Sequence, residues 1–408
     1  MTAAATTRHD ALVHAVQARL ARSAGSAALD ADALANLVRE EAGVISDLDM
    51  VEVLRQLRHE SHGTGALEPL LSMPGVTDVL VNGPDSIWFD RGCGLERATS
   101  ISLGDDAAVR RLATRLAHSC GTRLDDAQPF AGGRLLREDG STVRMHAVLA
   151  PPSESGTCLS LRVLRQATLS VAGLVERGTL SPALAAILQA MVARRWSFLI
   201  VGGTGSGKTT LLSALLSLVP DTERILCIED TPELAPRHPH VVNLVGRPAN
   251  VEGHGQITLS MLLRQGLRMR PDRIVVGEIR GAEIVDLLAA LNTGHDGGAG
   301  TAHANSIAEV PARIEALAAL GGLERTAAHS QLAAAVRVIL VMRRGADAKR
   351  RLAQVGTVRR GADGLVETTV VWDVDAGPQP GFAPLCHALG VPESLPEDPE
   401  LCAAKEPQ

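Results

Sequence analysis

A glycine-rich segment, GGTGSGKTT at residues 202–210, constrains the fold of this chain more than any other feature. It matches the pattern GxxxxGK[ST], and it lies between an apolar strand expected at 197–201 and an apolar helix expected from Thr209. The glycines let backbone N–H groups wrap a phosphate without Cβ clashes, and the helix N-terminus adds partial positive charge. This order of strand, loop and helix predicts a binding site for a nucleoside triphosphate.

The residues of this loop have expected roles at the nucleotide. Lys208 reaches the β- and γ-phosphates, and Thr209 places its hydroxyl on Mg²⁺. ATP and Mg²⁺ are therefore the expected ligands. The residues predicted to bind the nucleotide are Gly202, Gly203, Thr204, Gly205, Ser206, Gly207, Lys208, Thr209 and Thr210.

Acidic residues follow two more apolar strands in the same region. The strand around 274–276 delivers Glu278 to its carboxyl end, where ligands bind in open α/β sheets, and Glu278 is expected to orient or activate the attacking water. Glu229 and Asp230 end the strand at 225–228, and one of them is expected to reach the Mg²⁺ hydration shell or the water. A helix cap or a solvated turn stays open as the alternative for this acidic pair.

Histidines and arginines add further candidates. His303 follows His295 in a glycine-rich loop and is expected to hydrogen-bond the γ-phosphate or to relay its loss, although a lone histidine is more often a satisfied or surface residue. Four arginines beside the catalytic strand are interpreted as nucleotide or subunit contacts. They are Arg264, Arg268, Arg270 and Arg273.

The remaining pattern divides the chain into segments. Continuous apolar strands alternating with helices over 167–345 predict an α/β domain whose parallel sheet is covered on both faces. A smaller α+β domain is expected at 65–166, with strands at 76–81, 86–90, 133–136, 143–149 and 158–164 and a helix near 105–119. A helical segment is expected at 1–64, a β-hairpin at 346–375 and a Pro-rich, acidic, disordered tail at 376–408.

Composition limits the ligands that the chain can recognise. Only seven of its 408 residues are aromatic, which leaves few rings for a base-stacking surface, and the net charge of −6 gives no general attraction to nucleic acid or acidic membrane. No apolar run reaches the roughly 18 residues of a membrane span, so we expect a soluble, cytoplasmic protein. Adenine is expected to be held by aliphatic or Arg contacts unless Phe130 or Trp196 is placed for it, and Trp196 and Phe198 are expected to be core residues.

Four blocks together resemble the secretion ATPase superfamily, which powers type II secretion, type IV pili and type IV secretion. They are GGTGSGKTT at 202–210, IEDTPEL at 228–234, RPDRIVVGEIRG at 270–281 and LNTGHDGGAGTAHANS at 291–306. The segments VTDVLVNGPDSIWFDR at 76–91 and DGSTVRMHAVLAPP at 139–152 are most similar to the branch that assembles Flp-type tight-adherence pili, which itself resembles conjugation-type ATPases. The resemblance covers about 65–345.

The resemblance implies a bilobed subunit in a homo-hexameric ring, with a RecA-like P-loop domain preceded by a PAS-like α+β domain. It implies ATP bound between the two domains, with Arg134, Arg144 and Arg162 as phosphate contacts, some of them from a neighbouring subunit, and Arg280 at a subunit interface. The motor would drive pilus assembly or protein export at the cytoplasmic face of the inner membrane, through membrane platform proteins and without direct contact to nucleic acid.

Two other functions stay open at this stage. A conjugation-type nucleic-acid translocase would use the same ATPase core on a different partner. A nucleotide-binding scaffold would bind ATP without turnover, although Glu278 and His303 argue against it.

Overall fold

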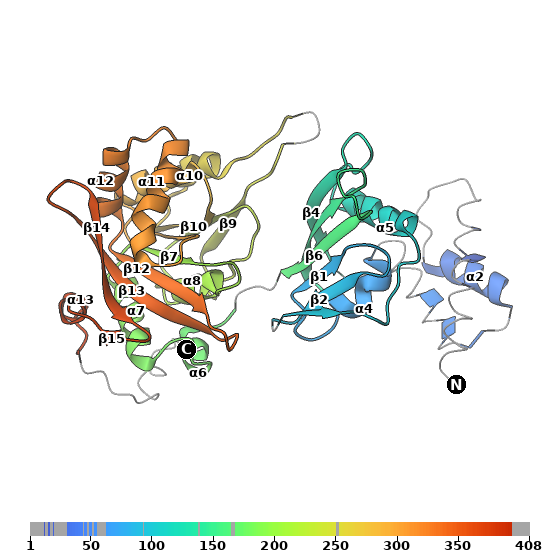
Figure 1. Cartoon of the computed structure of the whole chain (residues 1–408), viewed down its shortest axis with the longest axis horizontal. Helices are drawn as coiled ribbons and strands as arrows, with labels where there is room; N and C mark the ends of the chain where they lie inside the picture. The colour runs from blue at the N-terminus through green and yellow to red at the C-terminus, as the bar shows by residue number, and fades with distance from the viewer. Residues whose placement is uncertain are drawn as a thin grey trace. The chain divides into compact units, whose positions relative to one another are not determined.

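The computed structural model divides the chain into two compact units, Met1–Arg165 (unit 1) and Gln166–Gln408 (unit 2). It describes residues 63–393 apart from 93, 138, 165–167 and 250–252. Before these it describes residues 12, 15–16, 19, 31–43, 45–46, 49–50 and 53–54. Figure 1 traces both units along the chain. None of the helices in these described parts is long and apolar enough to cross a membrane.

The N-terminal segment forms a small helical cluster where it is described. Helix α2 spans Ala31–Ala42, and its Val38 packs with Val16, Met50 and Val53 in a separate core. The sequence prediction of helix is confirmed for α2, and the rest of the predicted helical segment 1–64 lies largely outside the described residues.

Unit 1 is built around an antiparallel sheet with the strand order β3-β2-β1-β6-β5-β4 in its described part. The strands are β1 (Asp78–Val81), β2 (Ile87–Asp90), β3 (Leu95–Arg97), β4 (Phe130–Leu136), β5 (Thr142–Val148) and β6 (Cys158–Leu164). Alternate side chains of these strands are buried, because the short helices η1 (Gly65–Leu67) and α4 (Glu68–Leu71) and the longer α5 (Asp106–Ser119) share a core with one face of the sheet. Sequence analysis missed β3 and placed the start of β4 three residues late.

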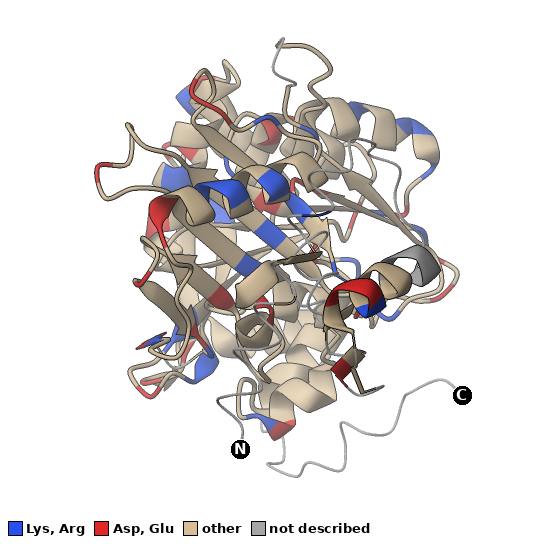
Figure 2. Cartoon of the chain, turned by 90° about the vertical axis from the view of Figure 1, so that its right-hand side faces the viewer, with Lys and Arg blue, Asp and Glu red and all other residues tan. Residues whose placement is uncertain are grey.

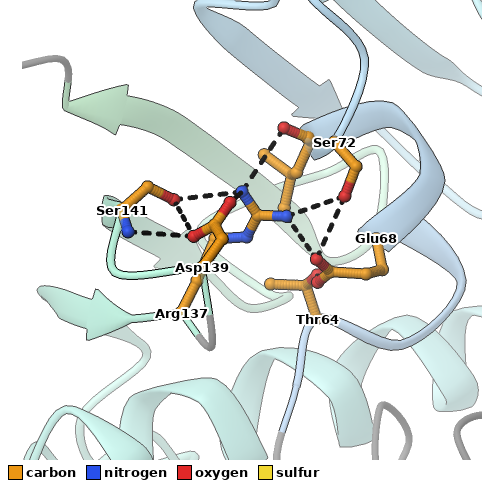
Figure 3. Close-up of polar contacts among 7 residues, drawn as sticks. Thr64, Glu68, Ser72, Arg137, Asp139 and Ser141 are labelled. Carbon is orange, nitrogen blue, oxygen red and sulfur yellow. Dashed lines mark hydrogen bonds and ion pairs between the residues drawn. The ribbon is translucent and has the colours of Figure 1, made fainter.

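The turn between β4 and β5 is tied to α4 by a buried arginine (Figure 3). The Arg137 side chain is only 8% exposed and donates to the carboxylates of Glu68 and Asp139. It also donates to the hydroxyls of Ser72 at 2.8 Å and Ser141 at 3.1 Å. This cluster fixes the far end of edge strand β4 against the helical layer.

Unit 2 contains a nine-stranded sheet with the order β15-β14-β13-β12-β7-β11-β10-β8-β9. The six strands from β12 to β9 run parallel, as expected, and β13 to β15 extend the sheet in antiparallel pairing. The strands are β7 (Phe198–Gly202), β8 (Ile225–Glu229), β9 (Val241–Val245), β10 (Arg273–Ile279), β11 (Ala299–Ala302), β12 (Val338–Arg344), β13 (Arg350–Arg360), β14 (Val366–Asp373) and β15 (Gly377–Pro378).

Helices cover both faces of this sheet, as strand β7 illustrates. Its residues Phe198 and Ile200 belong to one core, and Leu199 and Val201 belong to the other. The first core includes α6 (Val171–Glu176), α7 (Pro182–Ala193), α8 (Lys208–Leu216) and α13 (Phe382–Leu389). The second includes α9 (Leu259–Gly266), α10 (Glu283–Leu291), α11 (Val310–Leu320) and α12 (Arg325–Ala335). The short 3-10 turn η2 (Leu267–Met269) follows α9, and η3 (Ile307–Glu309) precedes α11.

The C-terminal region corrects one prediction. The hairpin of β13 and β14 forms as expected and joins the main sheet through β12. Residues 376–408 were predicted to be a disordered tail, and this is wrong for their first part, where α13 buries Phe382, Leu385 and Leu389 in a core of unit 2. Apolar side chains at helical spacing outweigh the local proline content there. Residues 394–408 lie outside the described residues.

Candidate nucleotide-binding site

The candidate site gathers at the carboxyl ends of four neighbouring parallel strands, β7, β11, β10 and β8. β7 ends at Gly202, β8 ends at Glu229 and β10 carries Glu278 next to its last residue, while His303 directly follows β11. Parallel strands present these ends at one edge of the sheet, which is where ligands bind in open α/β folds. The topology thus brings together the loop, acid and histidine blocks that were predicted separately.

The backbone of the glycine-rich loop requires glycine. Gly205 and Gly207 have φ of 70° and 99°, in the left-handed region. At Gly202, φ is 152°, and an added Cβ would lie 2.2 Å from the carbonyl oxygen of Met342 on the adjacent β12. Gly207 is the N-cap of α8, so the loop ends at a helix N-terminus. Together these features form an anion cradle of the kind that the sequence predicts.

Two polar side chains of the cradle suit a phosphate. Lys208 is 8% exposed, and its ammonium donates to the carbonyl oxygens of Gly202 at 2.9 Å and Gly203 at 2.8 Å. Burial lowers the pKa of Lys208, while nearby Glu278 opposes that effect. The Ser206 hydroxyl is buried and has no hydrogen-bond partner among the described residues. A buried orphan hydroxyl inside a ring of glycines fits a loop shaped for an anionic ligand.

Glu278 is held by two basic side chains. One carboxylate oxygen lies 2.6 Å from Nε2 of His303, and the other accepts from the guanidinium of Arg280. Burial acts to raise the pKa of Glu278, but Arg280 and His303 outweigh it, so the pKa lies below its ordinary value. Glu278 is therefore a carboxylate at neutral pH, oriented at the same sheet edge as Lys208.

Glu229 is more deeply buried, with 3% exposure, and burial raises its pKa to about 7. One oxygen accepts from the backbone N–H groups of Glu233 at 3.0 Å and Leu234 at 3.1 Å, which is the turn-capping role left open by the sequence. The other oxygen is buried and has no hydrogen-bond partner in the described part of the chain. It remains available for a ligand. Gly277 is required here because its Cβ would lie 2.6 Å from the Glu229 side chain.

These residues fit the predicted Mg²⁺. The hydroxyl of half-buried Thr209 at the start of α8, the spare oxygen of Glu229 and the exposed Asp230 beside it all offer oxygen donors. Mg²⁺ prefers such oxygen donors and recruits few protein carboxylates. Asp230 also lies close enough to Arg280 to raise the pKa of that guanidinium, so it belongs to the same electrostatic cluster.

Arg350 is a site residue that sequence analysis missed. It begins β13, and its Nε donates to the carbonyl oxygen of Gly205 at 2.9 Å, while its side chain lies against Gly207. This contact supports the loop from a strand 145 residues further along the chain. No local pattern marks Arg350, because it stands in a basic turn whose other residues make different contacts.

Arg273 corrects a second prediction. It begins β10, at the opposite end of the strand from Glu278, and its side chain is 1% exposed. It pairs with Glu223 at 2.6 Å and donates to the carbonyl oxygens of Val192 and Gly297. The prediction that Arg273 contacts a nucleotide or a subunit is therefore wrong, since a fully buried guanidinium has a structural role. Exposed Arg264 pairs with Asp286 on α10.

The three arginines implied for unit 1 form a row. The strand register places Arg134, Arg144 and Arg162 side by side on β4, β5 and β6, followed by Asp78 on β1. Figure 2 shows basic segments in a diagonal line on neighbouring strands near the centre of the view. Arg162 donates to Asp78 at 2.7 Å, whereas Arg134 and Arg144 are exposed and have no side-chain partner within the described residues.

Comparison with known proteins settles the family. Residues 60–365 match the family model described as type II/IV secretion system protein. The chain belongs to this family. A putative conjugal transfer protein of Mycobacterium tuberculosis is 58% identical over 336 residues, which covers 82% of this chain and 95% of that protein. The type IV secretion system protein PtlH of Bordetella pertussis is 34% identical over 266 residues, which covers 59% of this chain and 76% of PtlH.

Comparison with a solved structure confirms the predicted fold. The pilus retraction motor PilT, solved with bound ADP, superposes with a TM-score of 0.50 at 18% identity. The match covers 85% of this chain and 88% of PilT. At this identity the match shows the fold alone, and it confirms the predicted RecA-like P-loop α/β class.

Proposed function

We propose that this chain is an ATP-hydrolysing motor of a secretion or pilus-assembly system. Its loop would bind the triphosphate through Lys208, Thr209 and the backbone of 202–210, and Mg²⁺ held near Thr209, Glu229 and Asp230 would neutralise phosphate charge. The observation that carries the proposal is the geometry of Glu278, a carboxylate held by His303 and Arg280 at the same sheet edge as the phosphate loop.

Glu278 is suited to act on water. Its pKa is held low, so the carboxylate is ionised at neutral pH and is able to accept a proton from an attacking water. His303 fixes its orientation through the 2.6 Å contact, and a fixed base loses less freedom on reaching the transition state. The arginine row of unit 1 (Arg134, Arg144 and Arg162) would add positive charge to the polyphosphate, which in P-loop enzymes accelerates phosphoryl transfer.

The assembly and its place in the cell belong to the same proposal. We infer a homo-hexamer at the cytoplasmic face of the inner membrane, acting on membrane platform proteins of a pilus or secretion system and associated with the membrane through them. The family membership and the names of the relatives support this inference.

The test is phosphate release and ATP binding by the purified protein with Glu278→Gln. We expect turnover to fall by at least about 10²-fold while ATP affinity changes little, because the amide keeps the shape but cannot accept the proton. Glu367→Gln changes an exposed glutamate of β14 and serves as the matched control. If the wild-type protein binds ATP but releases no phosphate, the chain is a nucleotide-binding scaffold and the motor proposal fails.

A conjugation-type nucleic-acid translocase is the second candidate, favoured by the name of the mycobacterial relative. It would use the same ATPase site, but it also needs a surface for a nucleic-acid strand. Retention of single-stranded DNA at physiological salt, with ATPase stimulation by that DNA, would promote this candidate over the secretion motor.

A further inference from the structure

We propose that strand β4 pairs edge to edge with β4 of a second copy of this chain. β4 is one edge of the unit 1 sheet, and its seven residues pair with β5 without a register shift. The opposite edge, β3, has only three residues. Proteins protect long edge strands with proline, charged side chains or bulges, because the unpaired backbone groups there are a template for another strand. β4 has no proline and no bulge, and its single charged residue is Arg134.

The hydrogen-bond pattern shows which backbone groups of β4 point outward. At the two ends of the β4–β5 pairing, the backbone N–H of Leu149 donates to Pro129 at 2.7 Å and that of Arg137 donates to Ser141 at 2.8 Å. Hydrogen-bonded positions alternate along an antiparallel pair, so the odd-numbered residues of β4 bond β5. The backbone groups of the even-numbered residues therefore point away from β5, and they have no hydrogen-bond partner in the part of the chain that the structure describes. These residues are Phe130, Gly132, Arg134 and Leu136.

The sequence of β4, FAGGRLL, is self-complementary about Gly133. If two such strands run antiparallel with Gly133 opposite its own copy, even-numbered residues oppose even-numbered residues, so the outward backbone groups of both strands bond each other. Phe130 then lies opposite Leu136 of the second copy, and Gly132 lies opposite the other strand's arginine. Sliding one strand by two residues keeps the hydrogen bonds but places Arg134 opposite its own copy in one direction and opposite Phe130 in the other. The residues of β4 thus favour a single register.

The exposed apolar side chains of β4 cover one another in this register. Phe130 is 56% exposed and Leu136 is 79% exposed. Both project from the open face of the sheet, because Ala131 and Leu135 between them are buried. The twofold symmetry repeats the contact at each end of the paired strands, and a favourable cross-strand pair contributes about 0.2–1 kcal/mol. Pairing therefore removes from water two of the most exposed large apolar side chains in the described part of unit 1.

The charge of Arg134 is compatible with the pairing. Arg134 faces Gly132 of the second copy, and the nearest arginine of that copy lies on a diagonal, about 7–8 Å away along the sheet. Arg144 lies on β5, one strand further from the twofold axis. Salt screens the repulsion that remains between these exposed charges. The arginine side chains stay on the open face, so edge pairing leaves them accessible to an anionic ligand.

This contact is separate from the ring assembly of the proposed function. A pairing about a twofold axis uses the same surface on both copies, whereas a ring is built from two different surfaces of each subunit. The β4 pairing would therefore double whichever assembly the ring contacts form, and it does not depend on ATP hydrolysis. The Arg137 cluster holds the end of β4 (Figure 3), so little order is lost when the edge is paired. A single pair of strands makes a small interface, and we expect a weak association that grows with concentration.

The first experiment is sedimentation velocity of the full chain over a range of concentrations at physiological salt. Wild-type protein at high concentration is expected to form a species of twice the mass of Phe130→Glu and of Leu136→Lys. Each substitution places a charge against an apolar side chain twice in the paired species, and we expect it to weaken association at least about tenfold. Combining the two substitutions should recover the doubling, because opposite charges then face each other across the axis. Leu95→Lys changes an exposed leucine on the other edge strand and is the matched control, which should associate as the wild type does.

Amide hydrogen exchange tests the register within β4. The outward N–H groups of Gly132, Arg134 and Leu136 should exchange more slowly as the concentration of wild-type protein rises, because pairing gives them acceptors. The N–H groups of Ala131 and Leu135 already bond β5, so their exchange should not depend on concentration. Leu136→Lys should remove the concentration dependence of the outward group.

Three outcomes would overturn the proposal. They are equal mass of the wild-type protein and both single variants at every concentration, failure of the combined substitutions to recover the doubling, and slower exchange at the odd-numbered amides of β4 instead of the even-numbered ones. Phosphate release is measured in neither experiment, so a failure of the proposed function is a separate result.

Discussion

The two units present their charged residues in opposite ways. In unit 2, Lys208, Glu229 and Glu278 all have hydrogen bonds within the unit, at an edge that the parallel sheet defines. In unit 1, Arg134 and Arg144 project from an open sheet face and find no partner in the described residues. These internal hydrogen bonds orient the unit 2 side chains before a ligand binds, although the Ser206 hydroxyl and one oxygen of Glu229 are left without a partner among the described residues. A row of like charges has no such internal partners, and we propose that an anionic ligand supplies them.

The largest expected effect tests this contrast inside unit 1. Arg144→Ala should lower ATP turnover about 10³-fold, because an arginine positioned at a transferring phosphoryl group contributes at least that much in P-loop enzymes. The fold should remain, since the side chain is exposed and makes no hydrogen bond or ion pair with the described residues. Steady-state phosphate release and a urea unfolding curve measure the two quantities.

Arg162→Ala is the matched control for that variant. Arg162 lies in the same row, but Asp78 already neutralises it, so we expect turnover to fall less than tenfold. Equal losses of turnover for the two variants would mean that position in the row, and not unpaired charge, decides how much each arginine contributes to turnover. A wild-type rate in Arg144→Ala would mean that the arginine row of unit 1 does not contribute to ATP hydrolysis.

The second-largest expected effect is a loss of stability in unit 1. Arg137→Met should destabilise unit 1 by about 3–5 kcal/mol, because it removes the guanidinium that neutralises the carboxylate of Glu68, which is 18% exposed. Hydrogen exchange of amides in β4 and β5 measures the loss, and amides of unit 2 should be unchanged because each unit has its own core.

Arg110→Met provides the comparison within unit 1. Arg110 pairs with Asp126, whose side chain is 80% exposed, and such surface pairs contribute about 1 kcal/mol or less. If both variants lowered the opening free energy equally, burial of the Arg137 cluster would not be the cause. Adding Glu68→Gln to Arg137→Met should recover part of the stability, since it removes the negative charge that Arg137 neutralises.

The same contrast explains which parts of the candidate site could be predicted from the sequence. The unit 2 site could be predicted because each element follows an apolar strand and parallel strands must deliver their ends to one edge, as with Glu278 after 273–277. Arg350 was not predicted as a site residue, because its contact with Gly205 joins residues 145 positions apart and its own turn carries no recognisable pattern. Arg273 was misassigned although it begins the strand of Glu278 and so lies at the opposite end, because its pairing with Glu223 depends on tertiary packing.

Unit 1 was harder to predict for a related physical reason. The strands were found from alternating apolar residues, but the arginine row depends on register across β4, β5 and β6, which alternation alone does not specify. The roles of Arg134, Arg144 and Arg162 came from family resemblance and remain predictions. Helix α13 was missed because proline-rich composition suggests disorder, while its buried face is decided by tertiary packing.

The smallest expected effect is a change in pH dependence within unit 2. Arg280→Ala removes the guanidinium that lowers the pKa of Glu278, while the burial that raises it remains. The pKa of Glu278 should therefore increase, and the acidic limb of the pH–rate profile should move to higher pH, because protonated Glu278 cannot accept a proton from water. His303 still contacts the other oxygen of Glu278, so activity at pH 8 should fall less than in Arg144→Ala.

Arg264→Ala is the control for this prediction. It removes an exposed arginine paired with Asp286, and it should leave the acidic limb of the pH–rate profile in place. An unmoved limb in Arg280→Ala would mean that Glu278 is not the group whose ionisation limits turnover, and the contrast between internally oriented side chains in unit 2 and an unpaired arginine row in unit 1 would lose its chemical basis.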